Sequence, residues 1–215
     1  MRGYFLSIEG TDGSGKSSVA NLLKEELEKN GFEVILTREP GGSKIGEQIR
    51  DILLSKENSE LSKKCEALLY ASSRAQHVDE VIRPNLLDGK VVISDRYVFS
   101  SLAYQGYSRE LGIEDVMNIN KFAMGDVYPD RILFFDIEPE VSIKRRFNDS
   151  VADRIEQEGV LFQNKVYNGY MESIKLYPEN VSIIDARLTI DEVFNRCMEI
   201  IRGDLDEALS SNNSR

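Results

Sequence analysis

The stretch Gly10-Thr11-Asp12-Gly13-Ser14-Gly15-Lys16-Ser17 decides the fold of this chain. It fits the pattern G-x-x-x-x-G-K-[ST] at every fixed position. In that pattern, glycines let the backbone turn several N–H groups toward one anion, and the following helix adds the positive end of its dipole. The stretch therefore predicts a phosphate-binding loop between a strand and a helix.

The flanking sequence supplies that strand and that helix. The apolar run Tyr4 to Glu9 precedes the loop, and a helical pattern with an apolar stripe begins at Ser17 and stops at Gly31. Lys16 is expected to reach the β and γ phosphates of a nucleoside triphosphate, and the Ser17 hydroxyl to bind Mg²⁺. The residues predicted to contact the triphosphate are Gly10, Thr11, Asp12, Gly13, Ser14, Gly15, Lys16, Ser17 and Ser18.

Length and charge limit the class of protein. The chain has 215 residues, which suits a single domain over 1–203, followed by a polar tail over 204–215 that we expect to fray. A net charge of -10 argues against a general binder of nucleic acid or anionic membranes. We expect neither a signal peptide nor a membrane span, and hence a cytoplasmic protein. Cys65 and Cys197 are expected to be reduced, partly buried thiols.

Strand-like runs alternate with helical patterns along the chain. The expected strands are Tyr4 to Glu9, Glu33 to Arg38, Val91 to Asp95, Arg131 to Ile137 and Val181 to Asp185. This alternation predicts an α/β fold with a parallel sheet, in which ligands bind beyond the carboxyl ends of the strands. The polar residues at or just past these ends are Asp12, Arg38, Glu39, Asp95, Arg96 and Asp185.

A second set of residues is needed to choose among nucleotide-binding activities. Guanine-specific proteins with this loop generally carry Asn-Lys-x-Asp, whereas the strings here, Asn120-Lys121-Phe122-Ala123 and Asn164-Lys165-Val166-Tyr167, lack the Asp. A small-molecule kinase fits better, because it needs arginines that hold a second anionic substrate against the γ phosphate.

Three further stretches carry a specific resemblance. They are Thr-Arg-Glu-Pro-Gly-Gly-Ser at 37–43, Leu-Leu-Tyr-Ala-Ser-Ser-Arg at 68–74 and Asp-Arg-Tyr-Val-Phe-Ser-Ser-Leu-Ala-Tyr-Gln-Gly at 95–106. Together with the phosphate-binding loop, they resemble the thymidylate kinase family in order from Tyr4 to about Ile201. The resemblance implies a three-layer P-loop NTPase fold with a five-stranded parallel sheet and a short lid. It also implies ATP-dependent phosphorylation of dTMP to dTDP for dTTP biosynthesis, with Mg²⁺ as cofactor, by a homodimer.

The resemblance implies roles for individual residues. Arg50 and Arg96 would hold the acceptor phosphate, because the guanidinium fork suits phosphate oxygens. Tyr70 would stack on thymine, and Arg74 on the same helix face would bond the edge of the base. Asp12 would lie between the sugar 3′-hydroxyl and the metal. The other residues implied in dTMP binding are Arg38, Glu39, Pro40, Ser101, Tyr104 and Gln105, of which Tyr104 would crowd a 2′-hydroxyl and Ser101 could bond the base.

Two assignments stay open at this stage. Asp95 either binds Mg²⁺ through water or only orients Arg96. The segment 143–156, ending Asp-Arg-Ile-Glu, is the expected lid, and Gly13 stands where some members carry a catalytic arginine. The lid cation would then be Arg154, or else Arg145 or Arg146, unless the segment is only a solvated charged face. The expected catalytic residues are Asp12, Lys16, Arg96 and Arg154.

Two competing functions are compatible with the loop alone. One is another P-loop nucleotide or nucleoside kinase, from which Tyr70 with Arg74 would distinguish a thymidylate kinase. The other is a nucleotide-dependent switch that hydrolyses slowly and uses no small acceptor. His77, the only histidine, is expected at the surface. The lack of a catalytic histidine does not count against a kinase, because phosphoryl transfer to an ionised phosphate needs positioning and charge neutralisation more than a general base.

Overall fold

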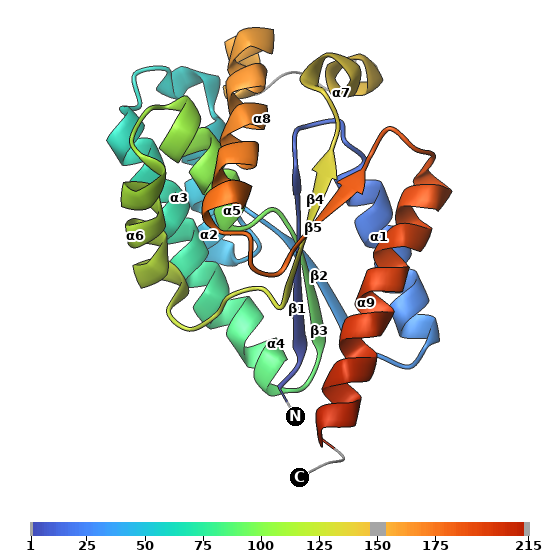
Figure 1. The fold of residues 1–215 in the computed structure, drawn as a ribbon. Coiled ribbons are helices and arrows are strands. Elements are labelled where there is room, and N and C mark those ends of the chain that lie inside the picture. Colours follow the sequence, from blue (N-terminus) through green and yellow to red (C-terminus); the bar gives the residue numbers. More distant parts are fainter. Residues whose placement is uncertain (1, 147–153, 213–215) are drawn as a thin grey trace.

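A parallel five-stranded sheet forms the centre of the molecule (Figure 1). The computed structural model describes residues 2–146 and 154–212. The strands are β1 Tyr4–Gly10, β2 Val34–Arg38, β3 Val91–Asp95, β4 Arg131–Asp136 and β5 Val181–Asp185, in the spatial order β2-β3-β1-β4-β5. All the pairings are parallel, so the prediction of a parallel α/β sheet is confirmed, with strand ends within one residue of those expected.

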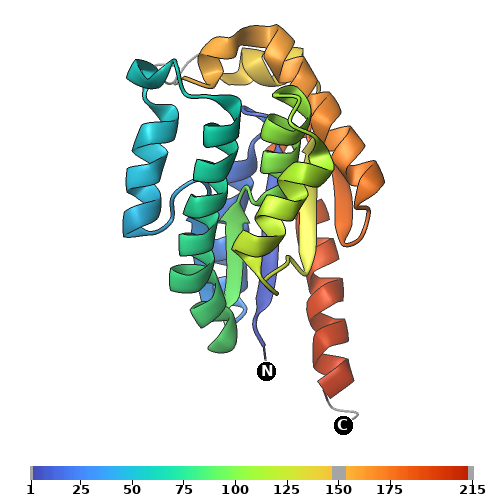
Figure 2. The ribbon, with the colours of Figure 1, turned by 90° about the vertical axis from the view of Figure 1, so that its left-hand side faces the viewer.

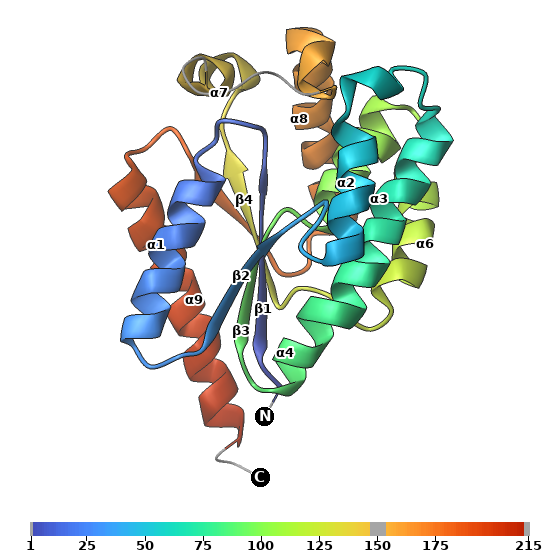
Figure 3. The same cartoon turned by 180° about the vertical axis from the view of Figure 1, so that it is seen from behind.

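Helices cover both faces of the sheet and so make three layers. Their bounds are α1 Lys16–Lys29, α2 Lys44–Leu54, α3 Lys63–His77, α4 Arg83–Leu87, α5 Val98–Ser101, α6 Ile113–Met124, α7 Pro139–Arg146, α8 Gly159–Leu176 and α9 Ile190–Asn212. Helices α1 and α9 lie together on one face, and α3, α6 and α8 lie on the other (Figures 1 and 3). Figure 2 shows α2 and α3 from the side, in front of the sheet.

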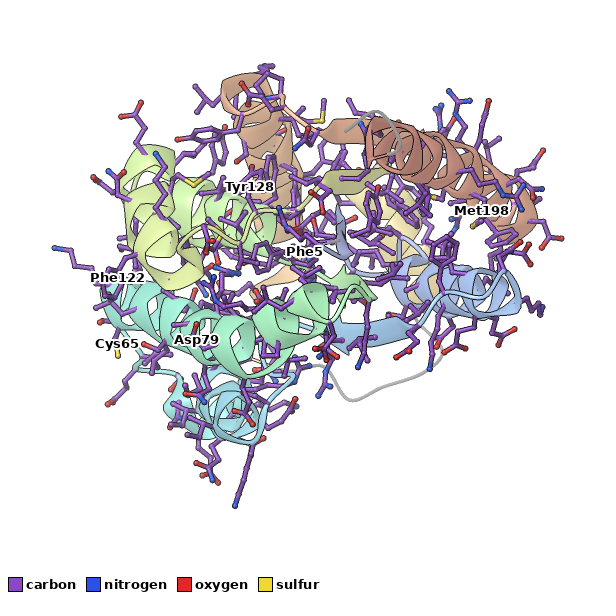
Figure 4. All side chains as sticks on the ribbon, turned by 90° about the horizontal axis from the view of Figure 1, so that it is seen from below. Phe5, Cys65, Asp79, Phe122, Tyr128 and Met198 are labelled. Carbon is purple, nitrogen blue, oxygen red and sulfur yellow. The ribbon has the colours of Figure 1, made fainter. Side chains whose placement is uncertain are left out.

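Each face of the sheet has its own apolar core, because strands covered on both sides need apolar residues in both alternating positions. Leu6 and Ile8 of β1 pack toward α1 and α9, with Leu23 and Cys197 in the same cluster. Phe5 points the other way, into the cluster that residues of α4, α5, α6 and α8 form. Figure 4 shows Phe5 inside the molecule and Met198 on the α9 side.

Short segments with irregular helical geometry connect the regular helices. Lys56–Asn58 and Glu156–Glu158 form 3₁₀ turns, and Val78–Ile82 and Leu102–Ser108 are π-helical. π-Helical turns widen a helix locally and often occur at functional sites. The second π-helical segment carries Tyr104 and Gln105, two of the residues implied in acceptor binding.

Helix α9 continues past Gly203, where the apolar stripe in the sequence ends. The next residue, Asp204, is anchored to the sheet. Its carboxylate accepts hydrogen bonds from Arg131 at the start of β4 and from the Tyr4 hydroxyl at the start of β1. These bonds give the polar turn after Gly203 a tertiary partner that apolar periodicity cannot reveal.

The two cysteines have different environments. Cys197 is buried, whereas Cys65 is exposed, so the prediction that both are partly buried was wrong for Cys65. Figure 4 shows Cys65 and Phe122 projecting outward from α3 and α6. Within the ranges 2–146 and 154–212, no helix has both the length and the apolar character that crossing a membrane requires.

Candidate active site

The phosphate-binding loop joins β1 to α1 at the carboxyl end of the central strand. A glycine is required at position 10 because its φ is +144° and an added β-carbon would lie 2.9 Å from the Phe135 carbonyl oxygen. Gly15, with φ at +91°, leads directly into α1. The predicted strand, loop and helix order is confirmed, and the loop opens toward the carboxyl edge of the sheet.

Lys16 lies inside this loop with only 6% of its surface exposed. Its ammonium group donates a hydrogen bond of 2.8 Å to the Thr11 carbonyl oxygen. Burial, helped by the nearby Arg96 charge, lowers the pKa of Lys16 to about 8. The Ser14 hydroxyl is also buried, and it has no hydrogen-bond partner among the described residues. A buried cation and a hydroxyl donor in one glycine-rich loop fit the oxygens of a bound phosphate.

Ser17 and Asp95, the two residues predicted to bind the metal, lie next to each other. The Ser17 hydroxyl donates to Asp95 Oδ2 at 2.6 Å, across the gap between α1 and the end of β3. No three His, Cys, Asp or Glu side chains gather as a metal cage in the part of the chain that the structure describes. One hydroxyl and one carboxylate fit the chemistry of Mg²⁺, because that ion usually keeps waters and phosphate oxygens and takes one or two protein ligands.

Arg96 follows β3 and occupies the centre of the site. Its backbone has φ at +73°, which is uncommon for a residue with a β-carbon and is often found at functional sites. Nη2 of its guanidinium donates to Asp12 at 2.6 Å, and Nη1 donates to the Tyr170 hydroxyl at 2.8 Å and to the Ser100 hydroxyl at 3.0 Å. The Tyr104 ring lies beneath the same guanidinium group. Asp12, Tyr170, Ser100 and Tyr104 therefore orient this arginine together with the end of β3.

Glu9 lies behind Arg96 and belongs to the same network. It is fully buried and accepts hydrogen bonds from the Tyr97 backbone N–H and the Ser100 hydroxyl. Burial raises the pKa of Glu9, although Ser100 and the Arg96 charge act in the opposite direction. Glu9, Ser100 and Tyr170 had no role assigned from the sequence. Glu9 adjoins the phosphate-binding loop, Ser100 lies within the stretch 95–106, and Tyr170 lies outside the recognised motifs.

Arg74 is held from several sides on the opposite wall of the site. It is 1% exposed and donates to Glu39 Oε2 at 2.8 Å, to the Ser101 hydroxyl at 3.0 Å and to the Tyr97 carbonyl oxygen at 3.0 Å. It also donates to Asn120 of α6. Sequence reasoning missed Asn120 as a site residue, because a single asparagine in a helical pattern gives no signal of its partner.

His77 is fully buried, so the prediction that it lies at the surface was wrong. It stands about one turn after Arg74 on α3, and its ring contacts Glu39 and Thr37. The physical reason is that α3 packs against the segment after β2, which places both residues of this helix face over Glu39. A helical pattern alone cannot show which face a neighbouring loop will cover.

One cavity of about 530 Å³ joins the phosphate-binding loop to the walls just described. It brings together every residue implied in dTMP binding, and the Ser17 and Asp95 pair. The loop residues that line it are Asp12, Gly13, Gly15, Lys16, Ser17 and Ser18, and those on the remaining walls are Arg38, Glu39, Pro40, Arg50, Leu54, Tyr70, Arg74, Asp95, Arg96, Tyr97, Ser100, Ser101, Tyr104, Gln105 and Ile155. Gly10, Thr11 and Ser14 are in the loop but not among the lining residues.

The arginines predicted for the lid lie in different places. Arg154 is 9% exposed and donates to Glu66 at 2.8 Å and to the Leu53 carbonyl oxygen at 2.8 Å, while its neighbour Ile155 lines the cavity. Arg145 donates to the carbonyl oxygens of Ala186 and Arg187. The rest of the predicted lid, 147–153, and the Arg146 side chain lie outside the described residues.

Glu66 connects Arg154 of the predicted lid to Gln105, which lines the cavity. Besides Arg154, its buried carboxylate accepts from Gln105 at 2.9 Å and from Arg109 at 3.2 Å. Burial would raise the pKa of Glu66, but the bonds from Gln105, Arg109 and Arg154 outweigh it and leave the pKa below its ordinary value. Position 66 carried no functional signal in the sequence, because its partners are distant along the chain.

The phosphate-binding loop, the Ser17 and Asp95 pair, and a wall of arginines in the same cavity define a P-loop phosphotransferase. The sequence model of thymidylate kinase matches residues 8–197. A thymidylate kinase from Finegoldia magna is 49% identical over 198 residues, covering 92% of this chain and 97% of the relative. One from Lactobacillus helveticus is 50% identical over 213 residues, covering 96% and 99% of the two chains. The chain belongs to the thymidylate kinase family.

Proposed function

We propose that this protein transfers the γ-phosphoryl group of ATP to the phosphate of dTMP and forms dTDP and ADP. The observation that carries the proposal is the continuity of the cavity, in which Lys16 of the phosphate-binding loop and Arg74 of the opposite wall line one space. An oxygen of the dTMP phosphate attacks the γ phosphorus, and the bond from that phosphorus to the β–γ bridging oxygen breaks, leaving its electrons on ADP. Membership of the family supports this reaction.

Charge placement is the main contribution of the donor side. Lys16 would bind the β and γ oxygens, exchanging its present acceptor on Thr11 for phosphate. Ser17 and Asp95 would hold Mg²⁺, which supplies neutralisation of phosphate charge when bound. Because the acceptor phosphate is already ionised, the site needs positioning and counter-charge rather than a general base.

The acceptor side would use Arg96 and Arg50 for the phosphate. Arg96 is pre-oriented by Asp12 and Tyr170, and Arg50 donates to the Pro40 carbonyl oxygen at 2.9 Å, beside the cavity. Pre-oriented donors need little reorganisation when charge develops, which favours the transition state. Tyr70 would stack on the base.

The edge of the base and the sugar would be recognised by other residues. Arg74 and Ser101 would bond the base edge, with Gln105 beside them, and Tyr104 would crowd a ribose 2′-hydroxyl. Arg74 already donates to Ser101 at 3.0 Å, and Gln105 is fixed by Glu66. Arg38, Glu39 and Pro40 would complete the wall. This arrangement supports a preference for a deoxynucleotide with a thymine base.

Arg154 is the proposed lid cation, and its present partners define what closure would require. Its guanidinium would have to leave Glu66 to reach a phosphate oxygen. If Arg154 supplies that charge, Arg154→Ala should lower kcat by roughly 10²-fold or more, whereas Arg145→Ala should lower it less. The reverse order would transfer the role to Arg145.

The acceptor preference is tested by coupling ADP release to a spectroscopic signal, with Mg-ATP and a panel of dTMP, dUMP, dGMP, dCMP and AMP. We expect dTMP to give the highest kcat/KM. A different best acceptor would indicate another nucleotide kinase, and slow hydrolysis without stimulation by any acceptor would indicate a switch. Chelation with EDTA should abolish turnover and added Mg²⁺ should restore it.

We further infer that the protein works as a homodimer in the cytoplasm, where both nucleotide substrates are available. The family resemblance motivates the dimer, and exposed apolar residues on α3 and α6 support it, since Phe122 is 92% exposed and Leu68 is 53% exposed. Sedimentation velocity should give a dimer for the wild type and a smaller species for Phe122→Asp. A monomeric wild type would contradict this inference.

A further inference from the structure

His77 is a buried polar residue that the proposed reaction does not use. It is the only histidine of the chain, it is 0% exposed, and it does not line the cavity. Its Nδ1 lies 3.0 Å from Glu39 Oε1, and its Nε2 lies 2.7 Å from Thr37 Oγ1. Because an ionised carboxylate only accepts hydrogen bonds, Nδ1 is the nitrogen that donates to Glu39.

Glu39 is held between His77 and Arg74. Its Oε2 accepts from Arg74 Nε at 2.8 Å and lies 2.7 Å from Arg74 Nη2, while its Oε1 accepts from His77. The side chain of Glu39 is only 3% exposed, so its hydrogen bonds to both partners are strengthened by the low local dielectric. Loss of the imidazole bond would leave Oε1 unpaired and allow the carboxylate to rotate, and Arg74 would lose the geometry of its paired contact.

His77 packs closely against the backbone at Gly42. A β-carbon at Gly42 would lie 2.6 Å from His77 Nε2 and 2.6 Å from Thr37 Oγ1, so the imidazole packs directly against bare backbone. The neighbouring Gly41 N–H donates to the Ser73 hydroxyl on the same helix at 3.1 Å. The segment after β2 and helix α3 are therefore joined on both sides of the Glu39 carboxylate.

We propose that His77 is a positioning residue that acts through Glu39 to orient Arg74 in the acceptor part of the cavity. Glu39 and Arg74 line the cavity, and His77 supports them from behind. The substrate that senses this orientation is the base of the acceptor nucleotide, so the inference rests on the proposed function. Its consequence is that acceptor discrimination, rather than ATP use, depends on a buried imidazole.

The two amide substitutions His77→Asn and His77→Gln separate the contacts of the ring. An asparagine amide can occupy the place of Nδ1 and still donate to Glu39, whereas a glutamine amide reaches the place of Nε2 and Thr37. We expect His77→Gln to raise the KM for dTMP, and to lower the ratio of kcat/KM for dTMP over dCMP, by roughly tenfold, the effect of losing one hydrogen bond to a buried charge. His77→Asn, which keeps the bond to Glu39 and loses only the contact with Thr37, should show a smaller loss than His77→Gln, and the KM for ATP should stay constant in both.

Val78→Ala is the matched control for stability. Val78 is the next residue along the chain, it is 0% exposed, and it packs in the apolar cluster. This variant should unfold more easily and keep the acceptor ratio of the wild type. The proposal would be overturned if the ratio of kcat/KM for dTMP over dCMP fell as much in Val78→Ala as in His77→Gln. It would also be overturned if this ratio were the same in His77→Asn and His77→Gln.

Thr37→Val provides a second route if the histidine variants do not fold. It removes the hydroxyl next to Nε2 with little change of shape, and we expect a shift of the acceptor ratio in the same direction but smaller. An unchanged ratio in Thr37→Val, where the histidine variants give no folded protein, would count against the proposal. A wild type that does not prefer dTMP would contradict the proposed function. If the wild type prefers dTMP and His77→Gln shows the same preference, only the role of His77 would be contradicted.

Discussion

Arginine, carboxylate and tyrosine meet at both ends of the parallel sheet, with opposite consequences. At the carboxyl ends of the strands, Arg96 donates to Asp12 and to the Tyr170 hydroxyl beside an open cavity. At the amino ends, Arg131 of β4 and the Tyr4 hydroxyl both donate to Asp204 of α9. The second cluster fastens a helix to the sheet and lines neither of the two cavities that flank the phosphate-binding loop.

The same kinds of side chain therefore line a ligand cavity at one end of the sheet and join a helix to the sheet at the other end. Loops leave the carboxyl ends of parallel strands and diverge, which opens a crevice for ligands. At the other end, Asp204 of α9 is bound to the first residues of β1 and β4, which holds this part of the helix against the sheet. Variants at the two ends of the sheet test this difference.

Arg74→Ala should give the largest loss of stability at the carboxyl end. Glu39 would be left buried without its arginine, and breaking a buried pair costs about 3–5 kcal/mol of unfolding free energy. Urea unfolding measures this loss, and the acceptor panel should also show weaker discrimination for dTMP. Arg131→Ala at the amino end, where the pair is more exposed, should cost less and should leave acceptor discrimination intact. Equal losses would break the proposed difference between the two ends.

Lys16→Ala should collapse kcat, by roughly 10²- to 10³-fold, because one buried cation would no longer meet the developing charge on the phosphates. The folded state should not suffer comparably, since burial of the ammonium group is itself unfavourable. Lys24, in the exposed part of the same helix, offers the control, and Lys24→Ala should retain turnover. Steady-state kinetics measures kcat for both variants. A near-normal kcat in Lys16→Ala would contradict a role of the phosphate-binding loop in the reaction.

Asp204→Asn should reduce stability by about 1 kcal/mol and leave kcat unchanged. Burial raises the pKa of Asp204, but hydrogen bonds from Arg131 and Tyr4 outweigh it, so the folded-state pKa lies below the ordinary 3.8. The carboxylate therefore stabilises the fold above pH 3.8, and this contribution is lost as the pH falls through the folded-state pKa.

The pH dependence of Asp204→Asn can be measured as urea midpoints from neutral to acid pH. The difference between wild type and variant should be full at neutral pH and should shrink in acid. Glu199→Gln, which breaks an exposed pair with Arg196 on the same helix, should change the midpoint less. A difference that grows in acid would contradict the sign of the pKa shift.

The smallest expected effect concerns the cysteines, which belong neither to the polar cluster around Arg96 nor to the one around Arg131. Cys65 is exposed, whereas burial raises the pKa of the Cys197 thiol to about 12. A thiol reagent such as dithiobisnitrobenzoate should modify one thiol in the native protein and both in denaturant. Rapid modification of both native thiols would indicate that α9 opens readily.

Much of the carboxyl-end site could be predicted because its residues lie in contiguous motifs. The loop from Gly10 to Ser17, the segment around Glu39 and the segment around Arg96 each follow a strand whose apolar run is visible in the sequence. Once those strands are assigned to a parallel sheet, their ends must meet at one edge. The cavity confirms that these segments come together.

The residues that were missed act across long separations in sequence. Glu66 meets Arg154, Asn120 meets Arg74, and Tyr170 meets Arg96. Each contact joins separate elements, and each partner alone reads as an ordinary polar residue of a helix. The wrong placement of His77 has the same origin, because α3 is covered by the segment after β2 on a face that periodicity leaves open.

The sequence by itself determined the phosphate-binding loop and the order of strands and helices along the chain, because backbone conformation and apolar periodicity are local properties of the chain. Its contiguous motifs also carried the resemblance to the family. The tertiary structure alone decided which polar groups face the cavity and which support it from behind. It buried His77 against Glu39, tied Arg154 to Glu66 and carried α9 past Gly203 to Asp204. These outcomes depend on which distant surfaces pack together, and burial then forces each polar group to find a partner.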